Sequence, residues 1–201
     1  MLQINLAGND IGGYYDEDGE LISTPEGPKA IADAIRVSGS LTECNVRGNE
    51  LDVESANVLA NVATEKRVML FGIKHDQTEA DFRDKGLKPS DAVLIANDIS
   101  VSGSLTSVDT RGNGIGGEGA EQLAAAVLGS ASMVTFGGVP IKELRADALA
   151  TLDLSRKDLG PTESIVLAGL LPVSRSLTQV QSNLIPHLIS LLAQPHGAPW
   201  P

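Results

Sequence analysis

Short stretches in which apolar and polar residues are spaced as in strands alternate with longer stretches whose apolar residues recur every three or four positions. The segment 105–127 shows both spacings. A strand is expected around Val108, and Asn113 and Ile115 follow it at a turn. The segment 118–127 then predicts a helix, because its apolar residues fall on one stripe. One strand, one turn and one helix therefore form the unit of the pattern.

This unit recurs along the chain, which predicts a repeated structure. The segments 2–11 and 41–51 match the strand and turn of 105–115, with Asn9 and Asn49 in the place of Asn113. Further helices are expected at residues 28–37, 54–63, 88–99 and 161–171. The phrase VSGSLT at 37–42 returns at 101–106 and nearly returns at 173–178. A larger two-unit repeat is therefore superimposed on the smaller one.

The repeat is irregular in the middle of the chain. The apolar run 68–73 predicts a strand, and 133–139 resembles it. The next candidate strand, at 79–82, follows too soon to leave room for a helix between them. We therefore expect the ladder of strands to be distorted around 68–82 and 133–154.

An acidic insertion occupies residues 14–27, between the first turn and the first helix, and we interpret it as a solvated loop. Its carboxylates, Asp16, Glu17, Asp18 and Glu20, also suggest a calcium site. An EF-hand loop would need an oxygen ligand in the place of Tyr14 and a Glu in the place of Pro25, so the loop interpretation is favoured.

The segment 177–201 contains no Asp, Glu, Lys or Arg and is largely apolar. It is expected to cap the last repeat. The alternative is a docking surface for another protein, in which Leu188, Leu192 and Trp200 would make contact, because uncharged apolar surface is costly to leave in water.

Composition narrows the class of protein. Of the 201 residues, 42% are hydrophobic but only 3% are aromatic, which favours a core of many small aliphatic layers. The net charge of −11 argues against nucleic acid as a partner and favours a basic protein. The single cysteine, Cys44, favours an intracellular location. No leader or membrane span is predicted. The protein is expected in the cytoplasm or in an organelle, which could be a plastid if a transit peptide was removed. These expectations are compatible with association with a membrane-bound complex.

Candidate catalytic groups are sparse. Gly114, Gly116 and Gly119 spell the G-x-G-x-x-G pattern of dinucleotide sites, but no buried apolar strand precedes them and no acidic residue follows at the required distance. His75, His187 and His196 are scattered, so neither a Ser-His-acid triad nor a zinc site is indicated. We expect no enzyme activity, no cofactor and no metal.

The phrase L-x-x-L-x-L-x-x-N-x-L/I-G, followed by a helix rich in Ala and Leu, resembles the leucine-rich repeat of the ribonuclease-inhibitor type. It is carried by Leu41-Cys44-Val46-Asn49-Leu51 and by Leu105-Val108-Thr110-Asn113-Ile115-Gly116. The segments FGIKHDQTEADF and LDLSRKDLGPTESIVLAGLLPVS resemble divergent repeats of algae and protists. The resemblance implies an α/β fold: a right-handed β-α solenoid, a short horseshoe with a parallel concave sheet and convex helices, irregular in places. One domain would span 1–201, with the asparagines serving as turn residues.

The resemblance also implies that strand residues between the inward ones face the concave side. These candidate partner-binding residues are Glu43, Asn45, Arg47, Asp81, Arg83, Ser107, Asp109, Arg111, Asp153, Ser155, Gln179 and Gln181, with Gln3 and Asn5 on the first strand. The leading hypothesis is a non-catalytic protein-protein interaction scaffold. The alternatives are an accessory structural subunit of a large assembly, such as an algal organellar complex, and an inhibitor or regulator of a basic enzyme.

Overall fold

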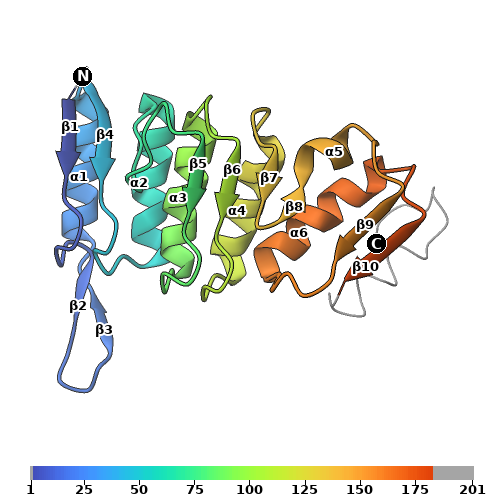
Figure 1. Cartoon of the computed structure of the whole chain (residues 1–201). Coiled ribbons are helices and arrows are strands. Elements are labelled where there is room, and N and C mark those ends of the chain that lie inside the picture. Colours follow the sequence, from blue (N-terminus) through green and yellow to red (C-terminus); the bar gives the residue numbers. More distant parts are fainter. Residues whose placement is uncertain (1, 183–201) are drawn as a thin grey trace.

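A computed structural model describes residues 2–182 of the chain (Figure 1). The helices are α1 (Glu26–Val37), α2 (Val53–Lys66), α3 (Pro89–Val101), α4 (Gly117–Gly129), α5 (Ile141–Arg145) and α6 (Pro161–Leu170), with a 3-10 turn at Leu171–Val173. The strands are β1 (Leu2–Asn5), β2 (Gly13–Tyr15), β3 (Leu21–Ser23), β4 (Leu41–Asn45), β5 (Glu79–Asp81), β6 (Ser107–Asp109), β7 (Thr135–Phe136), β8 (Val139–Pro140), β9 (Thr151–Leu154) and β10 (Gln179–Ser182).

The long helices lie where the sequence predicts them, with ends that differ by up to three residues. Local signals explain several of these ends. The Asp52 carboxylate accepts the backbone N–H of Ser55 at 2.7 Å and starts α2. Pro89 opens α3, where the Asp91 carboxylate accepts the N–H of Lys88 at 2.9 Å. Arg67 in the left-handed region ends α2.

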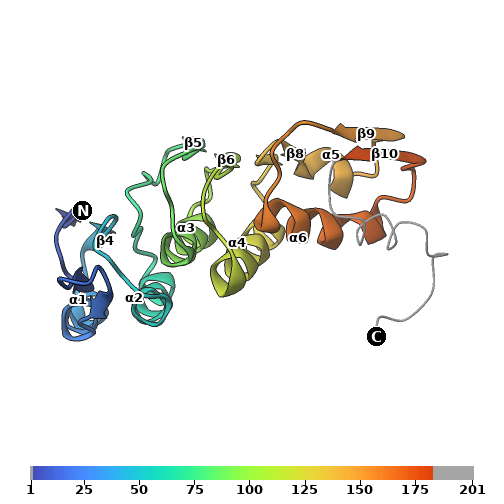
Figure 2. The same cartoon turned by 90° about the horizontal axis from the view of Figure 1, so that it is seen from below.

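The long helices form one layer, and the strands outside the β2–β3 hairpin form the other, with the short helix α5 on the strand side (Figure 2). The helices α1, α2, α3, α4 and α6 pack against one another in that order. Their apolar stripes face the strand layer, and the largest fully buried side chains, among them Phe71, Phe136, Leu59, Leu94 and Leu123, fill the space between. Packing of amphipathic helices on short strands therefore supplies the core.

The predicted fold class, a leucine-rich-repeat solenoid with one continuous parallel concave sheet, is wrong. Within residues 2–182 the strands form four separate small sheets: β1 with β4, β2 with β3, the four strands β5-β6-β7-β8, and β9 with β10. The β2–β3 and β7–β8 pairs are antiparallel. The described part of the chain is a mixed α/β structure, not a solenoid.

The first interruption of the sheet lies at 68–73, where the predicted strand is absent. One parallel bridge joins Met69 to Glu43 in β4, but the N–H groups of Leu70 and Phe71 turn to a side chain of the helix layer. The Asp98 carboxylate of α3 accepts both, at 2.5 and 2.9 Å. Because this carboxylate takes the donors that a neighbouring strand would use, β5 begins a new sheet.

The second interruption follows β7. Gly137 and Gly138, with φ of 52° and 82°, reverse the chain so that β8 returns antiparallel to β7. The short helix α5 follows at once. The next strand, β9, pairs with β10 in a separate sheet. The segment 133–154 therefore contains a hairpin, a short helix and a strand of another sheet.

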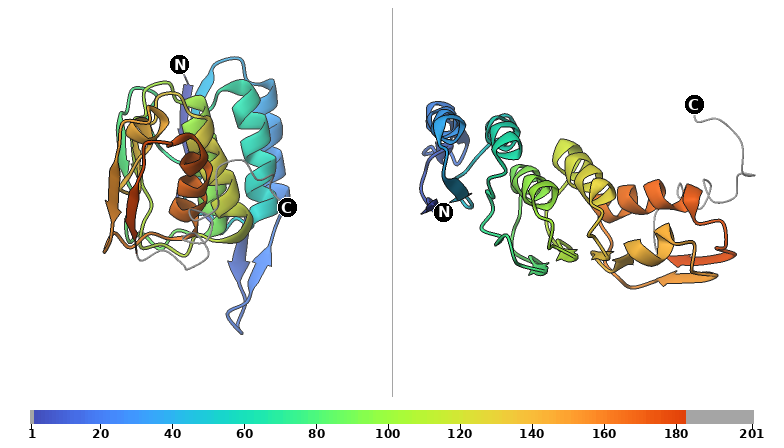
Figure 3. Two further views of the ribbon diagram at one scale, coloured as in Figure 1. Left: turned by 90° about the vertical axis from the view of Figure 1, so that its right-hand side faces the viewer. Right: turned by 90° about the horizontal axis from the view of Figure 1, so that it is seen from above.

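The insertion at 14–27 also differs from the prediction of a solvated loop. Residues 14–23 belong to the β2–β3 hairpin, with Tyr14 opposite Ile22 and Tyr15 opposite Leu21, and the last residues of the insertion begin α1. The hairpin extends away from the helix and strand layers (Figures 1 and 3).

Candidate functional site

Four charged side chains predicted to face a partner lie together on the four-stranded sheet. The register pairs Asp81 of β5 with Asp109 of β6, and an arginine follows two residues after each. Arg83 holds Asp81 through two nitrogens, at 3.0 and 2.7 Å. Arg111 holds Asp109 in the same way, at 2.9 and 2.6 Å. We call Asp81, Arg83, Asp109 and Arg111 the strand-face cluster.

The two pairs of the strand-face cluster are joined electrostatically. Arg83 Nε lies 3.6 Å from Asp109 Oδ2, so this carboxylate contacts both arginines. The Asp81 and Arg83 side chains are more than half exposed, whereas Asp109 and Arg111 are only about one-fifth exposed. The Asp81–Arg83 pair is therefore accessible to a partner, whereas the Asp109–Arg111 pair is largely buried.

Hydrogen bonds keep the cluster ionised. The bonds from the Arg83 guanidinium lower the pKa of Asp81 to about 2. Burial alone would raise the pKa of Asp109, but the hydrogen bonds from Arg111 outweigh it and leave that pKa below its ordinary value. The cluster thus presents two negative and two positive charges at neutral pH.

The end of β6 is fixed from the C-terminal side as well. Arg111 Nη1 donates to the carbonyl oxygen of Lys157 at 2.8 Å. A Cβ atom on Gly138 would lie 3.3 Å from the same nitrogen, so the β7–β8 turn leaves just enough room for the guanidinium. Arg111 therefore ties the four-stranded sheet to the segment after β9.

The predicted turn asparagines bridge the turns that follow the strands. Asn49 is buried, and its Nδ2 donates to the carbonyl oxygens of Leu6 and Val46 at 2.9 and 2.7 Å. Asn113 Oδ1 accepts the N–H groups of Lys85 and Leu87 at 3.0 and 2.9 Å. The Nδ2 of the exposed Asn9 donates to the Leu6 oxygen of its own turn at 2.8 Å.

The predicted contact residues on β4 and just after it make contacts within the molecule. Glu43 is buried, and its carboxylate pairs with Lys74 Nζ at 2.5 Å. Asn45 Oδ1 accepts the N–H of Arg47 at 3.1 Å. The Arg47 guanidinium lies over the rings of Phe71 and Phe82, at 5.2 and 5.7 Å from their centroids. This stack spans the first interruption of the sheet.

The remaining predicted residues lie apart from the cluster. Ser107 Oγ accepts a hydrogen bond from Thr135 across β6 and β7. In the β9–β10 sheet the register pairs Asp153 with Gln181 and Thr151 with Gln179, and Asp153 accepts the N–H of Ser155 at 2.9 Å. Leu188, Leu192 and Trp200, like most of the tail 177–201, lie outside the described residues.

Two buried carboxylates were missed by sequence reasoning. Asp98 lies inside a helix that was predicted from Pro89, Ser90 and Asp91 at its start. Glu163 is the third residue of α6, where its Oε2 accepts the N–H of Gly160 at 3.0 Å. Its Oε1 is buried without a hydrogen-bond partner among residues 2–182. Burial raises the pKa of both groups. The capping sequence Gly160-Pro161-Thr162-Glu163 could have indicated the second one.

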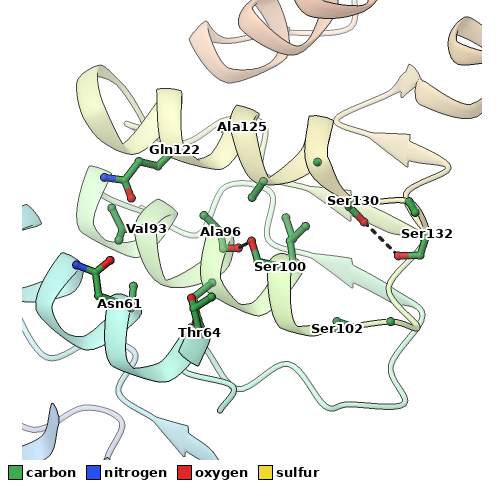
Figure 4. A pocket seen from close by; sticks show the side chains of 17 residues that line it. Asn61, Thr64, Val93, Ala96, Ser100, Ser102, Gln122, Ala125, Ser130 and Ser132 are labelled. Atoms are coloured by element: carbon green, nitrogen blue, oxygen red, sulfur yellow. Dashed lines mark hydrogen bonds between the residues drawn. The ribbon is translucent and has the colours of Figure 1, made fainter. Parts of the chain in front are cut away.

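A cavity of about 820 Å³ opens between α2, α3 and α4 (Figure 4). Its lining is small and uncharged, and several of its polar groups already bond one another. Ser100 Oγ donates to the Ala96 oxygen at 2.8 Å, and Ser130 and Ser132 lie 3.1 Å apart. No ionisable side chain lines it, so its walls offer no general acid or base.

Across residues 2–182, His, Cys, Asp and Glu side chains do not gather in groups of three or more that could hold a metal ion. Among the helices of the same residues, none is long and apolar enough to cross a membrane.

Comparisons with known proteins assign no family. No family model matches the chain, and no curated protein matches it. Among solved structures, one described as "Leiomodin-1 Actin-Binding Site 2 (ABS2)" is similar, with 15% identity over 86% of this chain and 89% of that one. Its TM-score of 0.35 is too low to support an argument about function.

Proposed function

We propose that this protein is a non-catalytic protein-binding module whose main contact surface is the strand-face cluster. The observation that carries the proposal is the fixed alternation of charge at the ends of β5 and β6 and in the residues that follow them. Each aspartate is held by two bonds from one arginine, and the second aspartate contacts both arginines. Such a surface needs little rearrangement to meet a partner of complementary charge pattern.

Arginine held in this way suits protein contacts. Its planar guanidinium keeps free edges and a face after pairing with a carboxylate, and arginine is enriched where proteins meet. Arg83 is half exposed and carries the accessible part of the cluster. The less exposed Arg111 and Asp109 hold the arrangement in place.

A charge exchange tests the proposal. Asp81→Arg combined with Arg83→Asp keeps the net charge and the pairing of one aspartate with one arginine. It inverts the order of the two charges that a partner contacts. The matched control exchanges Asp33 and Arg36 on α1, an exposed pair of similar accessibility.

Each purified form is used as bait in native extract, and bound proteins are quantified by mass spectrometry. A stoichiometric partner should be depleted by about tenfold or more with the strand-face exchange and be retained with the α1 exchange. Equal recovery by both exchanged forms and the wild type would contradict the proposal.

A further inference from the structure

The two faces of the β2–β3 hairpin are similarly exposed but differ in their contacts with the rest of the molecule. In an antiparallel pair, residues directly opposite each other share one face. Tyr14 and Ile22 therefore share one face, and Tyr15 and Leu21 share the other.

The face of Tyr15 is attached to the rest of the molecule. Tyr15 Oη donates to Glu50 at 2.9 Å and accepts from Lys88 Nζ at 2.8 Å. The Lys88 ammonium also lies 5.4 Å from the centroid of the tyrosine ring. At the base of the hairpin, Ser23 Oγ donates to Asp52 at 2.5 Å. These contacts hold the hairpin in a defined direction.

Among residues 2–182, no side-chain hydrogen bond or ion pair attaches the opposite face in this way. Tyr14 is 53% exposed and Ile22 is 38% exposed, and they form a cross-strand pair of an aromatic and a β-branched residue. Such a pair stabilises a hairpin, but here its outer surface remains in water. It is an unpartnered sheet face on a projecting element (Figures 1 and 3).

Negative charge surrounds this face at the tip. The five residues 16–20 include Asp16, Glu17, Asp18 and Glu20. Asp16 shapes the tip, because its Oδ1 accepts the N–H groups of Asp18 and Glu20 at 3.0 and 2.8 Å. The other three acidic residues are exposed. A surface complementary to the hairpin is apolar at its centre and carries Lys or Arg at its rim.

We propose that the hairpin docks on a basic protein, with Tyr14 and Ile22 filling an apolar depression and the carboxylates of the tip pairing with its Lys and Arg side chains. The inference rests on the proposed role in protein binding but uses a surface separate from the strand-face cluster. A second copy of the chain and a lipid bilayer are the competing occupants.

The test measures binding of a fluorescent synthetic peptide of alternating lysine and leucine by anisotropy, at low and at higher salt. One variant, Tyr14→Ser with Ile22→Ser, removes the apolar pair without changing net charge. Its control, Val58→Ser with Ile165→Ser, removes two similarly exposed apolar residues from α2 and α6.

A second variant, Glu17→Gln with Asp18→Asn, removes two charges from the tip. Its control, Glu65→Gln with Glu121→Gln, removes two exposed charges from α2 and α4. All four variants change exposed side chains, and denaturant midpoints verify that each retains the wild-type stability.

We expect either hairpin variant to weaken binding by about tenfold, either control to change it by less than about twofold, and salt to weaken wild-type binding. Loss of binding in the controls to the same degree would show diffuse attraction and overturn the proposal. So would unchanged binding by the hairpin variants.

Three further outcomes would also overturn it. The first is self-association in sedimentation that Tyr14→Ser with Ile22→Ser abolishes, which would make a second copy the occupant. The second is hairpin-dependent binding to phosphatidylcholine vesicles. The third is loss of peptide binding on exchange of Asp81 and Arg83, which would place the peptide on the strand face. Failure of the strand-face proposal alone leaves the peptide result unchanged.

Discussion

The Asp98 carboxylate, on α3, accepts the backbone N–H of Leu70 at 2.5 Å and thereby links the helix layer to the strand layer where the sheet is interrupted. The same carboxylate accepts the N–H of Phe71, and the neighbouring Asn97 donates to the carbonyl oxygen of Val68 at 3.0 Å. Two adjacent side chains of one helix thus satisfy backbone groups that a strand would otherwise pair. The helix layer is continuous across this point, whereas the sheet is not.

Replacing Asp98 should destabilise the protein strongly. Asp98→Ala leaves two buried N–H groups without acceptors, which should lower the free energy of unfolding by about 2 to 4 kcal/mol. Asp98→Asn keeps one oxygen acceptor and should cost less. Urea unfolding measures both, with Asp76→Ala, at an exposed position, as the control. A loss of less than about 0.5 kcal/mol for Asp98→Ala would show that these bonds do not stabilise the interruption.

Stability should fall as the pH rises toward neutrality. Burial raises the pKa of Asp98 from 3.8 to about 7. Between these values the folded state binds a proton that the unfolded state has released, so this stabilisation is present at low pH and is lost as the pH rises through about 7. The pKa values of Asp91 and Glu163 are also raised by burial, with the same sign.

The contribution of Asp98 is isolated by comparison with Asp98→Asn, which does not titrate. The free energy of unfolding, measured from about pH 5 to pH 8, should decline more steeply in the wild type than in the variant. Parallel curves would exclude Asp98 as the titrating group.

The turn asparagines should differ in their effect on stability. Asn49 is buried and bonds backbone groups of two turns, so Asn49→Ala should cost about 2 kcal/mol. Asn9 is exposed, and Asn9→Ala should cost less than about 1 kcal/mol. Thermal unfolding of the two variants under the same conditions tests the ranking, which equal losses would contradict.

Gly119 is required for the close approach of two helices. A Cβ atom at this position would lie 2.3 Å from the backbone oxygen of Pro89, so Gly119→Ala forces α3 and α4 apart. We expect a loss of about 1 to 3 kcal/mol in urea unfolding. Gly129→Ala, at the end of the same helix and facing open space, should be neutral or stabilising. A neutral Gly119→Ala would mean that the helices do not pack this closely.

The helices and several strands could be predicted from the sequence, because their apolar spacing reflects burial against one layer. The interruption at 68–73 could not, because VMLFGI has the composition of a buried strand. Its backbone partner is the side chain of Asp98, which lies 28 residues from Leu70 along the chain. No local pattern reports such a contact.

The sequence contains turn signals for both antiparallel hairpins, β2–β3 and β7–β8. Gly137 and Gly138 form a two-residue turn of the kind that joins antiparallel strands. Asp18 and Gly19 lie between Tyr14-Tyr15 and Leu21-Ile22, which also favours a hairpin. The segment 133–139 was instead interpreted as a repeat strand, and 14–27 as a solvated loop.

The strand-face cluster was only partly predictable. The resemblance to a leucine-rich repeat implied that Asp81, Arg83, Asp109 and Arg111 face one side of neighbouring strands. It could not distinguish them from Glu43 and Arg47, which the structure uses internally against Lys74 and the ring of Phe71. The contacts of Glu43 and Arg47 depend on Phe71, which lies in the segment 68–73, and on Lys74, which follows it.

The central claim, that the strand face contacts a protein partner, is tested most directly by photo-crosslinking in native extract. Glu79→p-benzoylphenylalanine places the reactive group at an exposed position of β5 beside the strand-face cluster, and Glu65→p-benzoylphenylalanine places it on α2. The account predicts a discrete crosslinked protein from position 79 that is absent from position 65. A crosslinked protein from position 65 alone, or none from position 79, would contradict it.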